Sequence, residues 1–405
     1  MLNNDNSNPL TDSFDLIDTI VSRVLNIDDY TYGDAKKGYL IRYRGRLRYE
    51  DTAAAYDQLA NALRPMSITP LFRWENNKHS VILIKGVVNP KPSKAWVNLI
   101  LFIVTLFSVI LTGGLNALSL PLPSDPLQLV WQIIVQGLPF AIAMIAILAA
   151  HEFGHYFAGR MHGVHVTLPY FIPMPFSPFG TMGAFINMKE PARNRRVLLD
   201  IGIAGPLAGL VVSLPVLIYG LSLSKVETLP YTIPSGTMLQ MEGNSLLYLL
   251  LKFVMFGKLL PQPESYGSLP AVVYWVRYFF TGIPFPWGGV DVMLHPVAWA
   301  GWAGLLVTSL NLIPAGQLDG GHVFYVLFGS KAAQKIRPLI LAALVLLGFA
   351  WFGWWLWAFI IFFLGRFHAE PLDQITELDG KRKILAVILL VIFILTFIPV
   401  PLMIY

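Results

Sequence analysis

The sequence predicts an α-helical polytopic membrane protein with a small soluble α+β domain at its N-terminal end. Of the 405 residues, 55% are hydrophobic and 13% are charged, whereas soluble domains carry about 25% charged residues. The mean hydropathy is +0.59. Several apolar runs reach the roughly 20 residues that a helix needs to cross a bilayer. All of them follow residue 92. We therefore divide the chain into a soluble domain, residues 1–92, and a transmembrane domain, residues 93–405.

The charge and the cysteine content exclude several kinds of site. The net charge is +5, but the basic residues gather beside apolar runs, which is typical of topology signals and not of a nucleic-acid surface. We expect a lipid bilayer around the protein and no nucleic-acid partner. Cysteine is absent, which excludes disulfides, thiolate metal ligands and cysteine nucleophiles. A metal site in this chain has to use histidine and carboxylate.

Residues 1–92 have the alternating pattern of a small mixed domain. Their polar, acidic start lacks the basic and apolar regions of a signal peptide, so we expect none. No motif here carries chemistry, and two roles stay open: binding of a partner or substrate, and packing on the transmembrane domain. The expected elements are an amphipathic helix near 16–24, a helix near 51–63 with Asp51 or Thr52 as N-cap, and strands at 38–43, 69–74 and 80–85.

The transmembrane domain is predicted from apolar runs separated by polar or proline-rich segments. Lys91 and Lys94 precede the first run, so its N-terminal side, with the soluble domain, is expected to be cytoplasmic. Lysines interrupt the apolar piece at 246–260, which favours an interfacial helix over a further span. The expected spans are 96–118, 127–157, 197–223, 292–313, a hairpin of two short helices within 338–367, and 384–404.

A proline-rich segment at 163–196 joins the second and third spans. Four prolines lie between residues 169 and 178, which excludes a helix there. We interpret residues 180–187 as an extended segment or hairpin that dips into the membrane, where non-helical backbone must be surrounded by protein or a water-filled cavity. An interfacial loop stays open as the alternative.

The strongest chemical signal lies at the inner end of the second span. Residues 151–155 read His-Glu-Phe-Gly-His, and a helix places both histidines on one face. This spacing is typical of a zinc site with a glutamate as general base. A catalytic zinc normally has three protein ligands, and the best third candidate is Asp319, because an unpaired carboxylate after an apolar run would be costly. We expect one zinc per chain.

Other residues near these motifs have two possible roles each. Asn311 could hold a developing oxyanion, or it could cap the backbone freed by Pro314. Gly202, Gly205 and Gly209 form a small-residue face on the third span, which we interpret as a helix-packing surface. Glu152 is expected to accept a proton and deliver it to the leaving amine.

These motifs closely resemble those of the site-2 protease family of intramembrane zinc metallopeptidases. The family's HExxH motif matches residues 151–155, and its NxxPxxxLDG motif matches residues 311–320. The resemblance extends over about 127–329, the expected catalytic core. It implies zinc ligation by His151, His155 and Asp319. It also implies an acid/base role for Glu152 and a supporting polar role for Asn311.

The segment between the motifs adds to the resemblance. Gly180, Thr181, Met182 and Gly183 resemble the family's membrane-embedded β-loop, which implies that they bind substrate. We see no PDZ domain between the motifs. Together with the soluble N-terminal domain, this resembles the subgroup that includes plant chloroplast and cyanobacterial members. The implied function is hydrolysis of peptide bonds within or near transmembrane segments of membrane-protein substrates.

Two other functions stay open on the sequence. Polar groups within spans also mark transport pathways, so a metal transporter is one alternative. A catalytically silent membrane scaffold is the other. The oligomeric state has no signal in the sequence.

Overall fold

The computed structural model describes residues 9–33, 38–118, 121–232, 239–364 and 370–404. The chain divides into two compact units. The first unit combines Met1–Pro92 with Lys189–Leu198 and Ala369–Arg382. The second unit contains the rest of the chain, including the long apolar helices. Only the first residues of the helices that begin at Arg195 and Gly380 belong to the first unit.

The first unit is a four-stranded antiparallel sheet with two helices. Its strand order is β1-β2-β4-β3, and its core includes the buried side chains of Tyr43, Tyr56 and Phe72. The structure confirms the helix near 51–63, with Asp51 accepting from the amide of Ala53 at 3.1 Å. The elements are α1 (Pro9–Ser22), β1 (Leu25–Tyr32), β2 (Ile41–Leu47), α2 (Thr52–Leu63), the 3₁₀ turn η1 (Arg64–Met66), β3 (Ile68–Glu75) and β4 (Lys78–Lys85).

Strand β3 is not the edge of this unit, because a segment far away in sequence pairs with it. The amide of Phe72 donates to the carbonyl of Leu372 at 3.0 Å, and the amide of Gln374 donates to the carbonyl of Phe72 at 3.1 Å. Between them, the amide of Asp373 donates to the carbonyl of Arg193 at 2.8 Å. Pairing protects an edge that would otherwise offer free backbone groups to other chains. The first unit is therefore built from three separate stretches of sequence.

We predict that Phe72→Ala strongly destabilises the first unit. The Phe72 side chain is fully buried and stacks edge-on against Tyr56 with ring centroids 5.3 Å apart. Truncating a buried phenylalanine costs about 3–5 kcal/mol. Hydrogen exchange of the full-length protein should show faster exchange of the β3 and β4 amides. Trp74→Ala on the same strand is the control, since Trp74 is 57% exposed. Equal exchange in the two variants would contradict the prediction.

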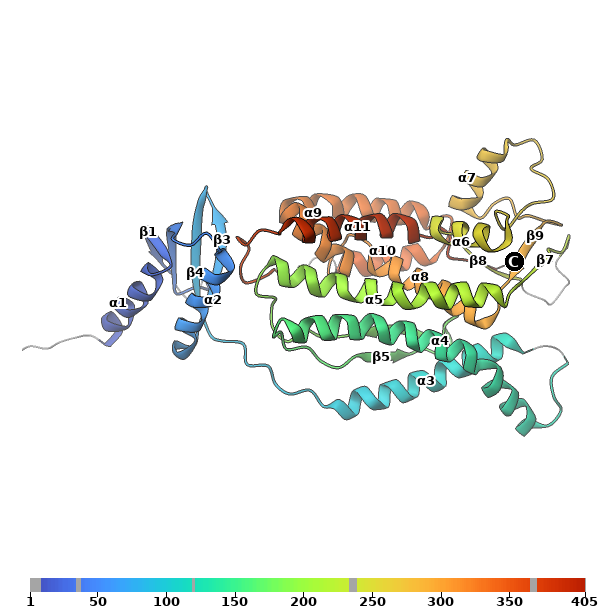
Figure 1. The fold of residues 1–405 in the computed structure, drawn as a ribbon, viewed down its shortest axis with the longest axis horizontal. Coiled ribbons are helices and arrows are strands. Elements are labelled where there is room, and N and C mark those ends of the chain that lie inside the picture. The colour runs from blue at the N-terminus through green and yellow to red at the C-terminus, as the bar shows by residue number, and fades with distance from the viewer. Residues whose placement is uncertain (1–8, 34–37, 119–120, 233–238, 365–369, 405) are drawn as a thin grey trace, which may run out of the picture. The chain divides into compact units, whose positions relative to one another are not determined.

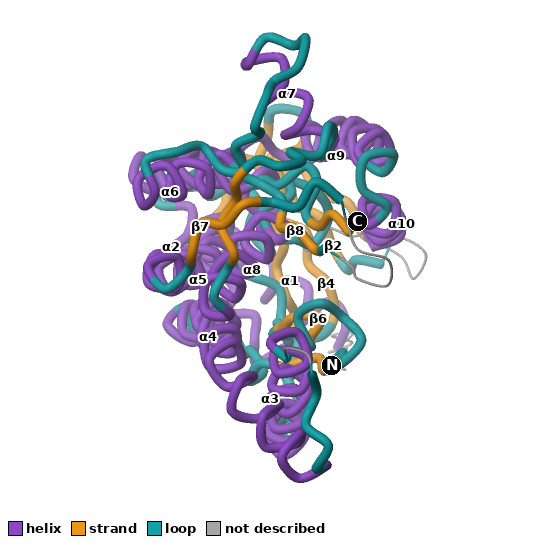
Figure 2. Tube along the Cα trace, turned by 90° about the vertical axis from the view of Figure 1, so that its right-hand side faces the viewer, coloured by secondary structure: helices purple, strands orange, loops and turns teal. Residues whose placement is uncertain are grey.

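The second unit is a helical bundle. Three of its described helices are long and apolar enough to cross a membrane: α3 (Ala95–Ala117), α4 (Pro126–Met161) and α5 (Arg195–Ser222). The spans expected at 96–118, 127–157 and 197–223 are thus confirmed. These helices run side by side (Figure 1), and Figure 2 shows them stacked in sequence order. The remaining helices are α6 (Leu246–Phe256), α7 (Ala271–Thr281), α8 (Pro296–Asn311), α9 (Asp319–Leu347), α10 (Gly353–Leu364) and α11 (Gly380–Thr396).

The last three predicted spans need correction. The fourth begins at Pro296, not residue 292, because β9 (Val290–Met293) pairs with β7 (Lys225–Thr228). The expected hairpin turns near residue 352, but its first helix is the long α9, which is interrupted at Gly329. The final helix ends at Thr396 instead of residue 404. Prolines at 399 and 401 cannot continue it, and β10 (Leu402–Ile404) pairs with β8 (Gln240–Glu242).

Residues 180–187, expected to be an extended segment or hairpin, contain the second strand of a hairpin. Strand β5 (Tyr170–Pro173) pairs with β6 (Thr181–Phe185). The hairpin lies against the middle of α3, where Ser108 Oγ donates to the carbonyl of Gly180 at 2.6 Å. Gly180 has φ +72°, and a Cβ there would lie 2.7 Å from Val109 Cα, so the turn requires glycine. The hairpin turn therefore packs beside the middle of α3, a helix long and apolar enough to cross a membrane.

The end of the bundle where α3 finishes and α4 begins is called here the distal end. Strands β7, β8, β9 and β10 lie there with α6 and α7 (Figure 1). Helix α6 has 11 residues, about 16 Å, and is too short to cross a bilayer of about 30 Å. For residues 246–260, the alternative of a further membrane span is therefore excluded.

Candidate active site

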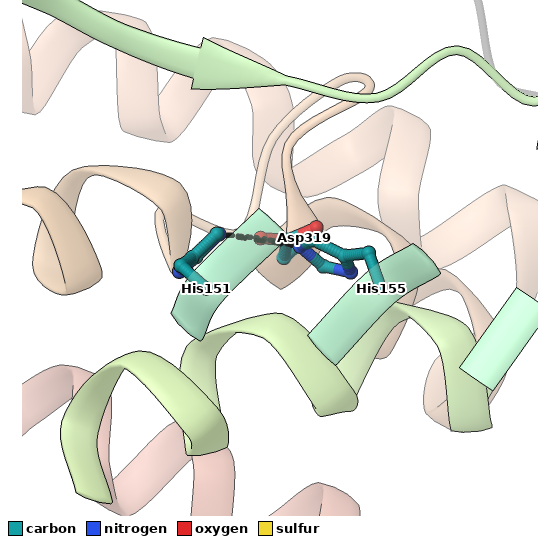
Figure 3. Close-up of side chains that lie close together, drawn as sticks. All are labelled: His151, His155 and Asp319. Atoms are coloured by element: carbon teal, nitrogen blue, oxygen red, sulfur yellow. Dashed lines mark hydrogen bonds and ion pairs between the residues drawn. The ribbon is translucent and has the colours of Figure 1, made fainter. Parts of the chain in front are cut away.

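Both histidines of the HExxH motif lie on one face of α4 and are buried. His151 is 3% exposed and His155 is 7% exposed. Their rings stand edge to face with centroids 4.9 Å apart. Figure 3 shows both imidazoles directed from α4 toward the same point. His155 lies six residues before the end of α4, about 9 Å along the helix, so the pair sits inside the helical layer near that end.

Asp319 reaches the same point from a different helix. It is the first residue of α9, and the chain bends between α8 and α9 at the segment that contains Pro314. A carboxylate at a helix N-terminus is stabilised by the helix dipole. A Cβ at Gly320 would lie 2.0 Å from the carbonyl oxygen of Leu312. The glycine that follows Asp319 therefore lets this bend close tightly.

The donor atoms of the three side chains are arranged like the ligands of a tetrahedral metal. Asp319 Oδ2 lies 3.4 Å from His151 Nε2 and 3.3 Å from His155 Nε2, and the two Nε2 atoms are 3.2 Å apart. Ligands held 2.0–2.1 Å from a tetrahedral zinc are about 3.3 Å from one another. Among the described residues, this is the only group of three such side chains that could hold a metal ion. The donor set fits zinc, with a fourth position left free.

Helix α5 orients one of the histidines. His155 Nδ1 lies 2.8 Å from the carbonyl oxygen of Ile201; a proton on Nδ1 donated to this carbonyl leaves Nε2 free as a ligand atom. One turn further along α5, a Cβ at Gly205 would lie 2.0 Å from His155 Nε2, and one at Gly209 would lie 3.2 Å from the His151 ring. Sequence reasoning interpreted these glycines as a packing surface. The side chains packed against them are the two histidines.

Glu152 and Asn311 complete the polar surroundings. Glu152 is 5% exposed, and the backbone amide of Ile186, just after β6, donates to its carboxylate. Asn311 is the last residue of α8, and its Nδ2 lies 3.2 Å from His151 Nε2. The structure thus brings both residues to the histidine pair. An amide this close to a candidate ligand nitrogen can also donate to an oxyanion formed there.

Strand β6 links the hairpin to this site. It holds Thr181, Met182 and Gly183, of which Met182 is 64% exposed. The two-stranded sheet leaves the outer edge of β6 unpaired among the described strands. The strand therefore presents backbone donors and acceptors beside Glu152. Among the described residues, 180–183 make no hydrogen bond or ion pair with His151 or His155. Any role of these four residues would therefore be in holding a peptide.

Residues 139–352 match peptidase family M50. This match covers more than half of the chain and contains both motifs and the three metal-site side chains. The chain belongs to peptidase family M50. The family assignment confirms the resemblance to site-2 proteases and the helical membrane-protein fold expected from the sequence.

Similar proteins bear names that agree with this family. The probable zinc metalloprotease EGY1, chloroplastic, of Arabidopsis thaliana is 29% identical over 339 residues, which cover 79% of this chain and 56% of the relative. The probable zinc metalloprotease EGY2, chloroplastic, of Oryza sativa subsp. indica is 26% identical over 400 residues, covering 95% of this chain and 66% of the relative. This M50 chain thus spans just over half to about two thirds of the length of these relatives.

Proposed function

We propose that this protein is an intramembrane zinc metallopeptidase that cuts membrane-protein substrates within or near a transmembrane segment. One observation carries the proposal: the donor atoms of two histidines and one aspartate converge at 3.2–3.4 Å. The histidines and the buried glutamate beside them lie on α4, a helix long enough to cross a membrane. Membership of family M50 supports the chemistry. The relatives that are named zinc metalloproteases support the choice of metal.

In this proposal, His151, His155 and Asp319 hold one zinc ion. Zinc in such a site lowers the pKa of water to about 7 and polarises a carbonyl oxygen. Two neutral imidazoles with one carboxylate would leave the centre at net +1, and ionised Glu152 would bring the local charge near zero. A near-neutral cluster is far less costly to bury than a bare dication. The burial of His151, His155 and Glu152 and the partial burial of Asp319 support this assignment.

The chain's own groups carry out the proton transfers and hold the reacting atoms. Glu152 accepts a proton at its carboxylate and delivers it to the leaving nitrogen. The Ile201 carbonyl fixes the orientation of the His155 ring. The Nδ2 group of Asn311 donates toward the oxygen on which negative charge develops.

Substrate would bind as an added strand. A helix in lipid has its backbone groups paired internally, so it must unwind before hydrolysis, and the freed groups need partners. The outer edge of β6, with residues 180–183 at its start, offers such partners by strand addition. Substrates should therefore carry helix-weakening glycine or proline near the cut.

We place the soluble domain and the α4 end that carries His155 on the cytoplasmic side, or on the equivalent side in an organelle, because Lys91 and Lys94 precede α3.

The proposal is tested by purifying the full-length protein, placing it in liposomes with a single-span substrate, and mapping products by mass spectrometry. We expect a cut within or next to the span, and faster cutting of a substrate with Gly/Pro near the cut than of a strongly helical one. Equal rates for both would contradict the unwinding step. Zinc flux into the liposomes without proteolysis would instead favour the transporter function. Zinc binding with neither flux nor proteolysis across a broad substrate panel would favour the scaffold.

A further inference from the structure

A cavity of about 710 Å³ lies at the distal end of the second unit, away from the metal site. Helices α3, α4 and α8 and the strands β8 and β9 line it, including Gln136, Glu242, Asp291 and Trp299. Its volume falls within the range of ligand pockets. Phe140 also lines it and lies 11 residues before His151 on α4, about 16 Å along the helix. The cavity is thus separate from the metal site but reached along the same helix.

Two buried carboxylates face this cavity with one cation behind them. Glu242 is 6% exposed, Asp291 is 2% exposed, and Lys252 is fully buried. The Lys252 Nζ lies 3.8 Å from Glu242 Oε1 and from Asp291 Oδ1, beyond hydrogen-bond distance. Among the described residues Nζ has no hydrogen-bond partner. One ammonium against two carboxylates leaves the ionised cluster with one excess negative charge.

Other polar atoms of the cavity wall also lack partners. Gln136 Oε1 and Trp299 Nε1 are buried and have no hydrogen-bond partner among the described residues. No lysine or arginine lines the cavity within the described part of the chain. His295, on the same wall, accepts from the Val297 amide at Nδ1. Glu242 Oε1 accepts from the Tyr248 hydroxyl at 2.9 Å and Asp291 Oδ1 accepts from the Val292 amide at 2.8 Å, so each carboxylate keeps room for a further donor. Gln136 Oε1 has none, and buried polar groups left unpaired are costly.

Strand β6 connects the cavity with the catalytic glutamate. At the hairpin turn, the Phe179 ring lies 6.0 Å from the Trp299 ring, centroid to centroid, and Thr112 Oγ1 donates to the Pro175 carbonyl. At the other end, the Ile186 amide contacts Glu152. A strand rises about 3.3 Å per residue. A peptide added to β6 would therefore span the interval from the site to the cavity in about five or six residues.

We propose that this distal cavity binds a basic side chain, lysine or arginine, carried by the substrate about five or six residues from the scissile bond on the distal side. The cation donates to the Gln136 oxygen and to the remaining acceptor sites of Glu242 and Asp291, and the peptide backbone offers an acceptor to Trp299. Burial raises the pKa of Glu242, and a second cation beside it would lower that pKa and so favour the ionised form. This inference rests on the proposed peptidase function and adds a determinant of substrate choice.

The test compares paired single-span substrates in liposomes that differ only by lysine or glutamine at one position, moved residue by residue along the distal side of the cut. For the native protein we expect kcat/KM to be about tenfold higher for lysine at the fifth or sixth residue, as for a partly buried charged hydrogen bond. In Glu242→Gln this ratio should fall to about one. Glu264→Gln is the matched control, because Glu264 is exposed and bonded to Tyr231 outside the cavity, and should keep the ratio.

Two further arms keep the inference testable. If Glu242→Gln does not fold, Gln136→Leu is used instead. This variant removes one cavity acceptor on α4 and should lower the lysine/glutamine ratio of kcat/KM by a smaller factor. If native protein cuts neither substrate, the proposed function fails, and affinities of Glu152→Gln protein for the same substrate pair decide the cavity separately. A lysine/glutamine ratio near one at every position in native protein, or an unchanged ratio in the folded cavity variant, would overturn the inference.

Discussion

Glu152→Gln is expected to abolish peptide-bond hydrolysis while leaving one zinc bound per chain. The substitution keeps the size and burial of the side chain but removes its ability to accept a proton. General acid–base catalysis contributes about 100- to 10,000-fold to a rate, so kcat should fall by at least about 100-fold. Glu152 belongs to no described group of potential metal ligands, which is why zinc should stay. Product formation in liposomes and metal content by mass spectrometry measure the two quantities.

Glu152→Asp is the matched control for this experiment. It keeps a carboxylate but ends one methylene short, so its rate should lie between those of the native protein and Glu152→Gln. Native-like cleavage by Glu152→Gln would rule out the proton-transfer role. Loss of zinc from Glu152→Gln would instead mean that this side chain holds the metal centre together.

Gly205→Ala should disrupt the metal site from the neighbouring helix. A Cβ at this position would lie 2.0 Å from His155 Nε2, closer than any non-bonded contact allows, so the imidazole must move off its position. Changes to the groups that orient a metal ligand typically cost 10- to 100-fold in metal affinity or activity. We expect a loss of at least about tenfold in zinc affinity, measured by competition with a fluorescent chelator, and a matching loss of cleavage.

Gly202→Ala provides the control for this substitution. It lies one turn earlier on α5, and its Cβ would meet His322 Cβ at 3.5 Å, an ordinary contact. Alanine favours the helix over glycine by about 1 kcal/mol at either position, so helix stability cannot explain a loss confined to Gly205→Ala. Native zinc affinity in Gly205→Ala, or equal losses in both variants, would contradict the close approach of α5 to His155.

The parts of the molecule that were predictable from sequence are those with local signals. Residues 151–155 predict a pair of imidazoles on one helix face because helical spacing is local. Asp319 was predicted as the third donor because a carboxylate after an apolar run needs a partner. The structure brings these donor atoms together, and their roles as zinc ligands remain a proposal that the metal experiments above address.

What sequence reasoning missed depends on contacts between distant residues. The Ile201 carbonyl that orients His155 has no side-chain signal, because every residue carries a carbonyl. The role of Gly205 beside His155 looks like ordinary helix packing until the neighbour is known. Strand β10 was assigned to a span because its residues are apolar; its pairing with β8, about 160 residues earlier, is what makes it a strand.

The first unit shows the same limit. In residues 1–92, local sequence patterns predicted two helices and three of the four strands. Strand β1 was not predicted, because it carries several polar residues. The pairing of the Phe72 backbone with residues 372 and 374 was also not foreseen. Such pairing depends on backbone groups and leaves little trace in composition.

The measurement that bears most directly on the zinc peptidase proposal is cleavage by the full-length protein in liposomes before and after metal removal. A chelator should remove one zinc per chain and stop cleavage of a labelled single-span substrate, and added zinc should restore both. His155→Ala protein should show no restoration at the same zinc concentration. Cleavage that continues in protein shown to be free of metal, or full restoration in His155→Ala, would contradict a metal centre built from His151, His155 and Asp319.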